Sequence, residues 1–279
     1  MKKRTASFSF ILWAALIIAL SCGGTARAVC CNTKFGISAL GSDTSGDYNS
    51  ALGFAALGRN TTGFFNTAVG SQTLGSITGS NNTAVGYLSL NGNGNDAGNN
   101  NTAVGSSSLF LNTSDNNTAV GFDTLQNNTT GSGNTAVGFE TLQNNTMGFD
   151  NTATGRNALF SNIAGVQNTA TGVNALVSNT TGGANTATGM QALDSNTTGR
   201  LNTATGFDAL DSNISGSNNT ADGFQALFSN TASNNTAQGF EALLKNTTGS
   251  NNTADGQQAL ASNTTGIDET AHGRACVGT

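Results

Sequence analysis

Apolar and polar positions follow one another along this chain in the order of a 17-residue tandem repeat. The repeating unit reads Asn-Thr-Ala-x-Gly-x-x-Ala-Leu-x-x-Asn-Thr-Thr-Gly-x-x, where x marks a variable position. Most units have this length, and a few are slightly shorter or longer. The units begin at Asn32, Asn49, Asn66, Asn82, Asn101, Asn117, Asn134, Asn151, Asn168, Asn185, Asn202, Asn219, Asn235, Asn252 and Glu269.

The positions of the unit differ in how much variation they accept. Position 5 is always glycine, position 8 is alanine, serine or threonine, and position 3 is alanine except at Lys34. Position 4 changes from Val69 through Thr154 to Asp222 and His272. A position that accepts only leucine faces a packed interior, whereas one that accepts valine, aspartate and histidine faces solvent. Position 9 is leucine in every complete unit and predicts a core ladder of Leu40, Leu57, Leu74, Leu90, Leu109, Leu125, Leu142, Leu159, Leu176, Leu193, Leu210, Leu227, Leu243 and Leu260.

This period predicts an all-β parallel β-solenoid, or β-roll, of 14 to 15 coils, each formed by one 17-residue unit. Helical repeats and propeller blades need about 33 residues or more, and leucine-rich repeats need about 20 to 29. Glycine, asparagine and threonine in every unit also disfavour helices. A 17-residue coil has room for two strands of about five residues joined by turns. We expect the Asn-Thr-Thr-Gly segment to form a turn, with glycine or asparagine supplying positive φ. Stacked coils would form a rod about 70 Å long, with leucine on leucine and asparagine on asparagine.

The predicted core is thin, because each unit supplies one large apolar side chain. Burying a leucine stabilises by roughly 1.5–3 kcal/mol, while ordering the backbone costs roughly 1–2 kcal/mol per residue. Self-association would bury more apolar surface, and we expect a homo-oligomer, with a trimer as the first expectation and a filament as the alternative. The candidate contact stripe is the recurrent phenylalanine at position 6, and the competing interpretation is a partly covered outer surface. The stripe comprises Phe54, Phe122, Phe139, Phe207, Phe224 and Phe240.

The N-terminal segment 1–28 is typical of an export signal. A basic start precedes the apolar run Phe8–Leu20, and Ala26-Arg27-Ala28 matches a cleavage site that would leave Val29 as the first mature residue. The apolar run is shorter than the roughly 20 residues that span a bilayer, although a retained anchor is an alternative. Lipidation at Cys22 is another, and it is the expected route to a membrane. The predicted organisation is a signal peptide over 1–28 and one solenoid domain over 29–279.

Charge and side-chain chemistry exclude several classes of function. The mature part keeps six of the ten basic residues and all fifteen acidic ones, a net charge of −9. Because so few basic side chains cannot hold the phosphates of a nucleic-acid backbone, we expect no nucleic-acid partner. We expect no enzyme, metal or cofactor, because the one histidine, His272, stands at a variable position without an oriented nucleophile beside it. The acidic residues are dispersed over variable positions, and the glycine-rich calcium-repeat signature is missing.

Two features suggest more specific hypotheses. The mature cysteines Cys30, Cys31 and Cys276 are odd in number, and along a rod Cys276 would lie too far from the other two for a disulfide. We therefore consider a disulfide between chains, with a strained Cys30–Cys31 bridge or free thiols as the alternatives. The second feature is a set of Thr-x-Thr rows in four consecutive units, the spacing of ice-binding solenoids, for which ordinary strand surface is the competing interpretation. These rows are Thr152/Thr154, Thr169/Thr171, Thr186/Thr188 and Thr203/Thr205.

The Ala-x-Gly-x-x-Ala centre of each unit, as in Ala136-Val137-Gly138 followed by Thr141-Leu142, resembles the head repeat of trimeric autotransporter adhesins, the YadA-like heads. Similar arrays occur in tail-fibre-like and bacterial surface proteins. The resemblance covers residues 32 to 279 and implies a left-handed parallel β-roll of three chains used for attachment. This chain departs from that family, because head repeats are usually shorter than the unit found here and are followed by a coiled-coil stalk and a β-barrel anchor.

These observations predict a secreted or cell-surface bacterial protein that acts as an adhesin-like or fibre module without catalysis. Its partners would be further copies of itself and a host or matrix surface ligand, bound through repeated weak contacts. The alternative function is a structural matrix subunit that polymerises end to end through its open terminal coils. An ice-binding solenoid is the third hypothesis.

Overall fold

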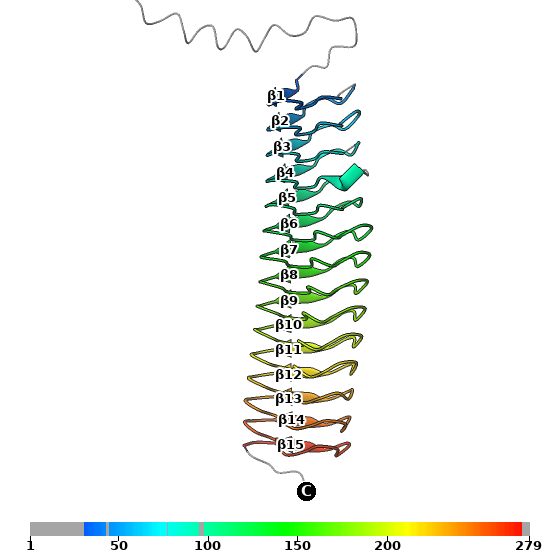
Figure 1. Ribbon diagram of the computed structural model, residues 1–279. Helices are drawn as coiled ribbons and strands as arrows, with labels where there is room; N and C mark the ends of the chain where they lie inside the picture. The colour runs from blue at the N-terminus through cyan, green and yellow to red at the C-terminus, as the bar shows by residue number, and fades with distance from the viewer. Residues whose placement is uncertain (1–30, 43–44, 77, 95–97, 275–279) are drawn as a thin grey trace, which may run out of the picture.

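The computed structural model describes residues 31–42, 45–76, 78–94 and 98–274, which form an all-β parallel solenoid. Fifteen strands pair side by side in sequence order in one sheet, and Figure 1 shows them stacked in a single column. The predicted fold class is therefore confirmed. The strands are β1 (Thr33–Phe35), β2 (Ser50–Leu52), β3 (Thr67–Val69), β4 (Thr83–Val85), β5 (Thr102–Val104), β6 (Thr118–Val120), β7 (Thr135–Val137), β8 (Thr152–Thr154), β9 (Thr169–Thr171), β10 (Thr186–Thr188), β11 (Thr203–Thr205), β12 (Thr220–Asp222), β13 (Thr236–Gln238), β14 (Thr253–Asp255) and β15 (Thr270–His272).

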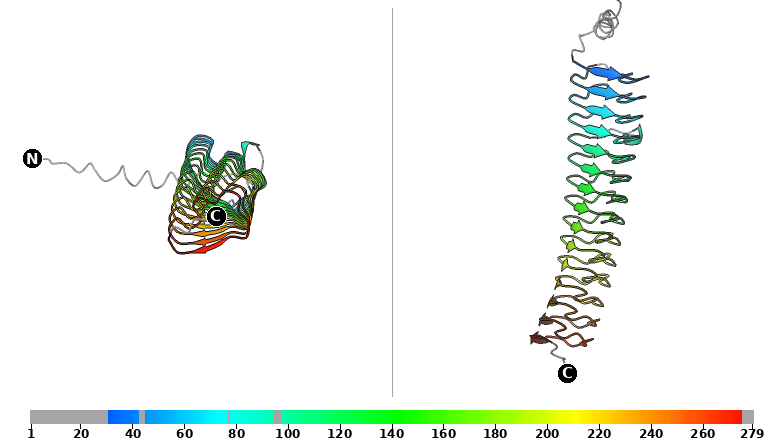
Figure 2. Two further views of the ribbon diagram at one scale, coloured as in Figure 1. Left: turned by 90° about the horizontal axis from the view of Figure 1, so that it is seen from below. Right: turned by 90° about the vertical axis from the view of Figure 1, so that its left-hand side faces the viewer.

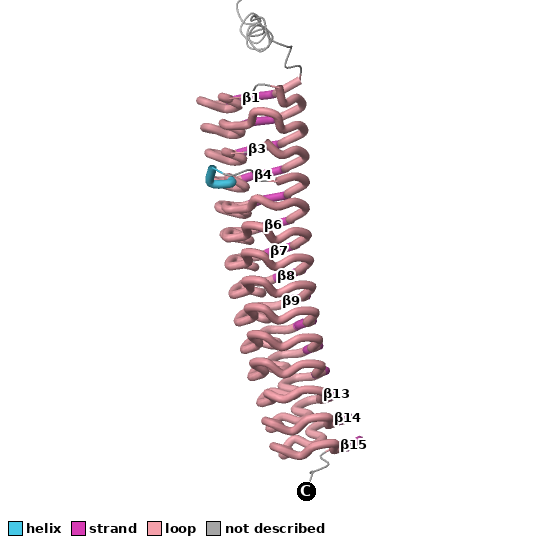
Figure 3. The backbone as a smooth tube through the Cα atoms, turned by 90° about the vertical axis from the view of Figure 1, so that its right-hand side faces the viewer, coloured by secondary structure: helices cyan, strands magenta, loops and turns pink. Residues whose placement is uncertain are grey.

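The strands stay in register even where the repeat length changes. Thr67 pairs with Thr83 across a 16-residue unit, and Thr83 pairs with Thr102 across the 19-residue unit. The longer unit contains a short 3-10 turn over Gly92–Gly94, which projects beyond the neighbouring coils (Figures 1 and 3). Seen along the axis, the coil outlines superimpose, and the side view shows a gently bent rod (Figure 2). Length changes are therefore absorbed away from the sheet.

The strands are shorter than the sequence predicts. Instead of two longer strands, each described coil has one three-residue strand at positions 2 to 4. The inter-coil hydrogen bonds nevertheless continue beyond it: Asn157 N donates to Phe139 O in the preceding coil at 3.0 Å, and Leu159 N donates to Ala175 O in the next at 3.0 Å. The strand ends because Asn157 and Leu159 have φ of 57° and 53°, which is left-handed and not extended.

Positive φ values do not fall where the sequence analysis placed them. The glycine that ends the Asn-Thr-Thr-Gly segment does not have positive φ, whereas positions 5, 7, 9 and 17 do. At position 5 glycine is required for two reasons, which Gly155 illustrates. Its φ is 132°, and a Cβ there would lie 2.4 Å from Gly172 O in the next coil. The invariant glycine therefore permits close stacking of the coils.

The core consists of three columns of small and medium side chains. Alanine at position 3, a small residue at position 8 and leucine at position 9 all point inward and are buried along the rod. The position-9 leucines from Leu57 to Leu243 have no exposed surface, while Leu40 and Leu260 near the ends are 4 % and 2 % exposed. One leucine per coil is thus enclosed by two columns of small residues, which lets successive coils approach closely.

Two columns of buried asparagines run beside this apolar core. At position 1, each coil's backbone N–H donates to the asparagine Oδ1 of the preceding coil at 2.6–3.0 Å, from Asn49 to Glu269. Within one coil, Gly165 O accepts from Asn151 Nδ2 at 2.9 Å and Asn162 Nδ2 at 3.0 Å. Apart from Asn213 Oδ1, the buried amides of these two columns are therefore paired, as burial of polar groups requires.

The position-12 ladder is sensitive to repeat length, and the position-1 ladder is not. Between Asn112 and Asn263 the position-12 bonds join successive coils except between Asn213 and Asn230. There the 16-residue unit lets Asn230 Nδ2 bond Ala232 O at 2.8 Å, and Asn213 Oδ1 has no hydrogen-bond partner in the described structure.

None of the described residues forms a helix long and apolar enough to cross a membrane.

Candidate functional site

The outer face of the sheet carries positions 2 and 4 of every coil. In β8 to β11 both positions are threonine and both are exposed, while the alanine between them is buried. The four Thr-x-Thr rows therefore lie side by side on consecutive strands, facing away from the core. This places the rows without testing ice binding, which stays a prediction.

The position-6 phenylalanines form stacked groups on the surface. Phe122 and Phe139 stack with their ring centroids 5.3 Å apart, and Phe207, Phe224 and Phe240 form a three-ring stack at 5.4 and 5.1 Å. Phe207 is half-buried, and the other position-6 phenylalanines remain 40–52 % exposed. Their near-parallel rings present edges to solvent along the rod. Their role as a contact stripe stays a prediction.

A second aromatic stack was not anticipated from the sequence. Tyr48 and Phe65, at position 17 of the first two units, stack with centroids 5.0 Å apart and are 55 % and 57 % exposed. Position 17 accepts many residue types, so its variation in the sequence gave no signal of stacking. In-register coils bring any two successive aromatic residues at one position into contact.

A group of three aspartates lies on the side of the rod formed by positions 7 and 10. Burial raises the pKa of Asp194 to about 6, with further contributions from the negative charges of Asp211 and Asp208. The pKa of Asp211 is raised as well, by burial and by Asp208. Asp208 is 9 % exposed, and its Oδ2 accepts a hydrogen bond from Gln225 Nε2 at 3.2 Å. In-register stacking therefore concentrates negative charge that the sequence pattern shows only as dispersed acids.

No catalytic or metal-binding arrangement is found over the described ranges. His272 Nδ1 lies 3.8 Å from Asp255 Oδ2 in the preceding coil, and both side chains are more than half exposed. Among these residues, no group of three or more histidine, cysteine, aspartate or glutamate side chains could hold a metal ion.

The cysteine and export predictions fall mostly outside the described residues. Cys31 is exposed with a free thiol. Cys30, Cys276, Cys22 and the signal segment 1–28 lie outside the described ranges, so the proposed disulfide between chains, the lipidation and the cleavage stay predictions.

No protein-family model matches this chain, and a search of the curated proteins finds no match. The solenoid is therefore established from the structure itself. The likeness to autotransporter head repeats is limited to the repeat pattern, and no family assignment supports it.

Sequence reasoning recognised the asparagine repeat as stacking but did not place the amides in the interior. Both asparagine columns are buried, including Asn151 and Asn162, although asparagine usually lies at the surface. The available signal was the near-invariance of position 1, which matches that of the leucines. It indicates a structural function for these amides and leaves positions 2, 4, 6, 7, 10 and 17 as the candidates for contact with other molecules.

Proposed function

We propose that this chain is a stiff, secreted or surface-displayed rod that acts as an adhesin-like or fibre module and carries out no catalysis. The observation that carries the proposal is the position-1 asparagine ladder, which links every coil from Asn32 to Glu269 by a hydrogen bond along the rod interior. Such a rod is continuous along its ladder and presents the same exposed positions once per coil. Repeated weak contacts to a surface can then add up to firm attachment without any single strong site.

The first coil favours discrete rods over end-to-end filaments. Position 3 is a buried alanine in the coils that follow, but in the first coil it is Lys34, which is exposed at the rod end. A further coil stacked on β1 would enclose the Lys34 ammonium in the column that Ala51 begins. Burying an unpaired charge costs several kcal/mol, so Lys34 disfavours addition at this end.

We also propose that the rods associate side by side, as a trimer in the first instance. The exposed aromatic stacks support lateral association, because they leave apolar ring surface in solvent over two adjacent coils at Phe122 and Phe139 and over adjacent coils around Phe224 and Phe240. Contiguous exposed apolar surface of this kind commonly marks a protein contact.

Three measurements test this proposal. Light scattering gives the mass of the purified chain, and a monomeric mass would rule out the trimer. Electron microscopy is expected to show separate rods about 70 Å long, whereas long filaments would support the polymerising alternative and overturn the discrete rod. Labelled rods are expected to coat bacterial or host-matrix surfaces, and absence of coating would remove the adhesive role.

The proposed location has its own test. We expect the exported protein to begin at Val29, as read by N-terminal sequencing. Retention in the cytoplasm with an intact N-terminus would contradict secretion.

A further inference from the structure

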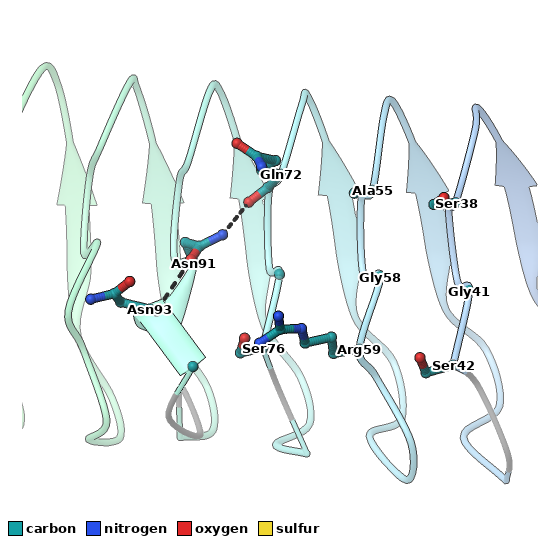
Figure 4. A pocket seen from close by; sticks show the side chains of 12 residues that line it. Ser38, Gly41, Ser42, Ala55, Gly58, Arg59, Gln72, Ser76, Asn91 and Asn93 are labelled. Atoms are coloured by element: carbon teal, nitrogen blue, oxygen red, sulfur yellow. Dashed lines mark hydrogen bonds between the residues drawn. The ribbon is translucent and has the colours of Figure 1, made fainter.

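A groove runs along the rod over the first four coils, on the side formed by positions 7, 10 and 11 (Figure 4). Its floor is made of glycine and small residues, and its polar side chains come from four successive coils. Arg59 extends along the rod across it. The lining comprises Ser38, Gly41, Ser42, Ala55, Gly58, Arg59, Gln72, Gly75, Ser76, Asn91, Asn93 and Gly94.

The groove exists because position 10 is glycine in three consecutive coils, at Gly41, Gly58 and Gly75. The backbone does not require glycine there, since none of the three has a positive φ. Later coils carry larger residues at this position without a change in the turn. Gly58 N donates to Ala55 O at 3.1 Å, and at the same position of a later coil Phe160 N donates to Asn157 O at 3.2 Å. The glycines therefore provide space on the surface rather than backbone freedom.

The 19-residue unit closes one end of the groove. Asn91 folds back so that its Nδ2 donates to Gln72 O at 2.7 Å, and its Oδ1 accepts from Asn93 N at 3.2 Å (Figure 4). A Cβ at Gly75 would lie 2.4 Å from Asn91 Nδ2, so this end is closed only because Gly75 has no side chain. The one long insertion among the units thus lies where the glycine run ends.

The groove is lined by one nearly buried serine and one exposed arginine. Ser76 is only 8 % exposed as a whole residue, and its hydroxyl is not one of the buried polar atoms that lack a partner among the described residues. Arg59 is exposed, and no described carboxylate forms an ion pair with it. A serine hydroxyl that lines a groove can both donate a hydrogen bond to a ligand and accept one from it. A guanidinium beside that hydroxyl suits a carboxylate, which can accept two parallel hydrogen bonds.

The groove offers side chains and no free backbone along its described floor. Ser42 N donates to Gly58 O at 3.1 Å, Gln72 N to Phe54 O at 2.8 Å and Ser76 N to Asn91 O at 3.0 Å, so the coil ladder already uses these groups. An extended peptide binds mainly by adding main-chain hydrogen bonds to a free edge, which this floor does not provide. A ligand rich in hydroxyl and carboxylate groups is the better match to hydroxyl, amide and guanidinium side chains.

We propose that this groove binds a short stretch of an acidic saccharide chain of the uronic acid class. A carboxylate of the chain pairs with Arg59, and neighbouring sugar hydroxyls bond Ser76 Oγ, Ser42 Oγ and Asn91. The groove is open along the rod, and its coil spacing of about 4.8 Å resembles the length of one sugar residue. The proposal deepens the adhesive function proposed above by naming a ligand class. It rests on that function only in assuming that the rod is displayed where such saccharides occur.

Calorimetric titration of the purified chain with hexamers of galacturonic acid and of mannuronic acid tests this proposal. We expect saturable binding at one site for at least one hexamer, and much weaker binding of its methyl ester, which lacks the carboxylate charge. Arg59→Gln is expected to lower the affinity at least about tenfold, since it removes a charge-assisted hydrogen bond. Binding of neither hexamer, or equal binding of the ester, would overturn the assignment.

One groove-filling variant and one matched control separate the groove from general surface effects. Gly58→Gln places in the groove a side chain that Gln126 and Gln143 carry at the same position of later coils, so the fold is expected to persist while binding is lost. Ala261→Gln introduces the same side chain at position 10 of a distant coil and is expected to bind normally. Undiminished binding by Gly58→Gln, or equal binding of a polyglutamate peptide, would refute the saccharide groove. Surface coating that survives in Gly58→Gln would leave the adhesive rod standing without this site.

Discussion

Replacing one buried asparagine of the position-1 ladder tests whether the ladder stabilises the rod. Asn168 has no exposed surface, and its Oδ1 accepts from Asn185 N at 3.0 Å and from Asn185 Nδ2 at 3.1 Å. Its own Nδ2 donates to Gly182 O at 2.9 Å. Alanine would leave the Asn185 N–H buried without an acceptor, whereas Gly182 O keeps its bond from Asn179 Nδ2 at 3.1 Å. Asn185 Nδ2 likewise keeps Gly199 O at 2.9 Å.

The expected cost of Asn168→Ala follows from that inventory. One orphaned buried donor costs about 1–3 kcal/mol, and the lost side-chain bonds add about 1 kcal/mol net. We therefore expect the stability of the adjoining coils to fall by about 2–4 kcal/mol. Because repeat rods unfold in parts, a single global unfolding energy is a poor readout, and local opening is the quantity to measure.

Native-state hydrogen exchange at the Asn185 amide reports that opening. A cost of about 2–4 kcal/mol lowers its protection roughly 30- to 1,000-fold, with smaller effects several coils away. Thr169→Val on the same coil is the control, because it removes an exposed hydroxyl and is expected to change stability by less than about 0.5 kcal/mol. Protection at Asn185 within threefold of the unaltered chain would refute the view that the ladder contributes to stability.

Three further substitutions have expected outcomes. Asp194 has a pKa raised to about 6 by burial and by Asp211, so the folded state binds its proton more tightly than the unfolded one and stability falls as pH rises from about 4 to 6. Asp194→Asn is expected to flatten the pH dependence of local opening around this coil, as read by native-state hydrogen exchange. Because the carboxyl is half-exposed, the substitution is expected to add less than about 1 kcal/mol at pH 7. An unchanged pH profile would contradict the shift. Gly155→Ala is expected to cost about 3 kcal/mol or more, measured as local opening of the adjoining coils by native-state hydrogen exchange, since its φ is 132° and the new Cβ would meet Gly172 O. Leu159→Ala removes a fully buried side chain and is expected to cost about 2–5 kcal/mol by the same assay, and a loss below about 1 kcal/mol would show that the core is not packed at this column.

The period and the interior leucines could be predicted because the recurrence of one residue type at the same position of every coil has a direct physical cause. A residue that stacks on its own copies must fit one environment repeated along the rod, so variation is removed wherever that environment is closed. Gly155 and Leu159 illustrate the two causes: the first permits close approach of backbones and the second fills the core. Both leave a visible mark in a single sequence.

Strand length could not be predicted, because it depends on backbone angles that residue type does not dictate here. Leu159 has a φ of 53°, a conformation that leucine seldom adopts, and Asn157 beside the strand has 57°. The stacked coils hold these values through inter-coil hydrogen bonds that no local propensity describes. The expectation of longer strands rested on coil length alone and did not include these left-handed residues next to the strand.

The groove escaped prediction for a different reason. Gly41, Gly58 and Gly75 appear in the sequence as ordinary variation at a tolerant position, since Phe110, Gln126 and Asp194 occupy it elsewhere. Only the structure shows that consecutive glycines at one position remove a continuous strip of surface. An absence of side chains becomes informative when stacking places the absences next to one another.

Some positions of the coil hold the register and others are free to change, and this difference explains why the groove lies on the side formed by positions 10 and 11. Positions 1 to 5 and position 9 hold the register, and the strands pair partner for partner in short, ordinary and long units alike. All changes of length therefore fall between position 10 and the next position 1, where Asn213 loses its ladder partner and Gly92–Gly94 projects from the surface. New binding surfaces, including changes of loop length, can arise on that side without disturbing the core, whereas a change of length within the strands or a change in the leucine column would break the stack. The glycine run and the insertion that ends it occur together on this variable side, in agreement with a binding groove built onto a rod whose register and core are fixed by stacking.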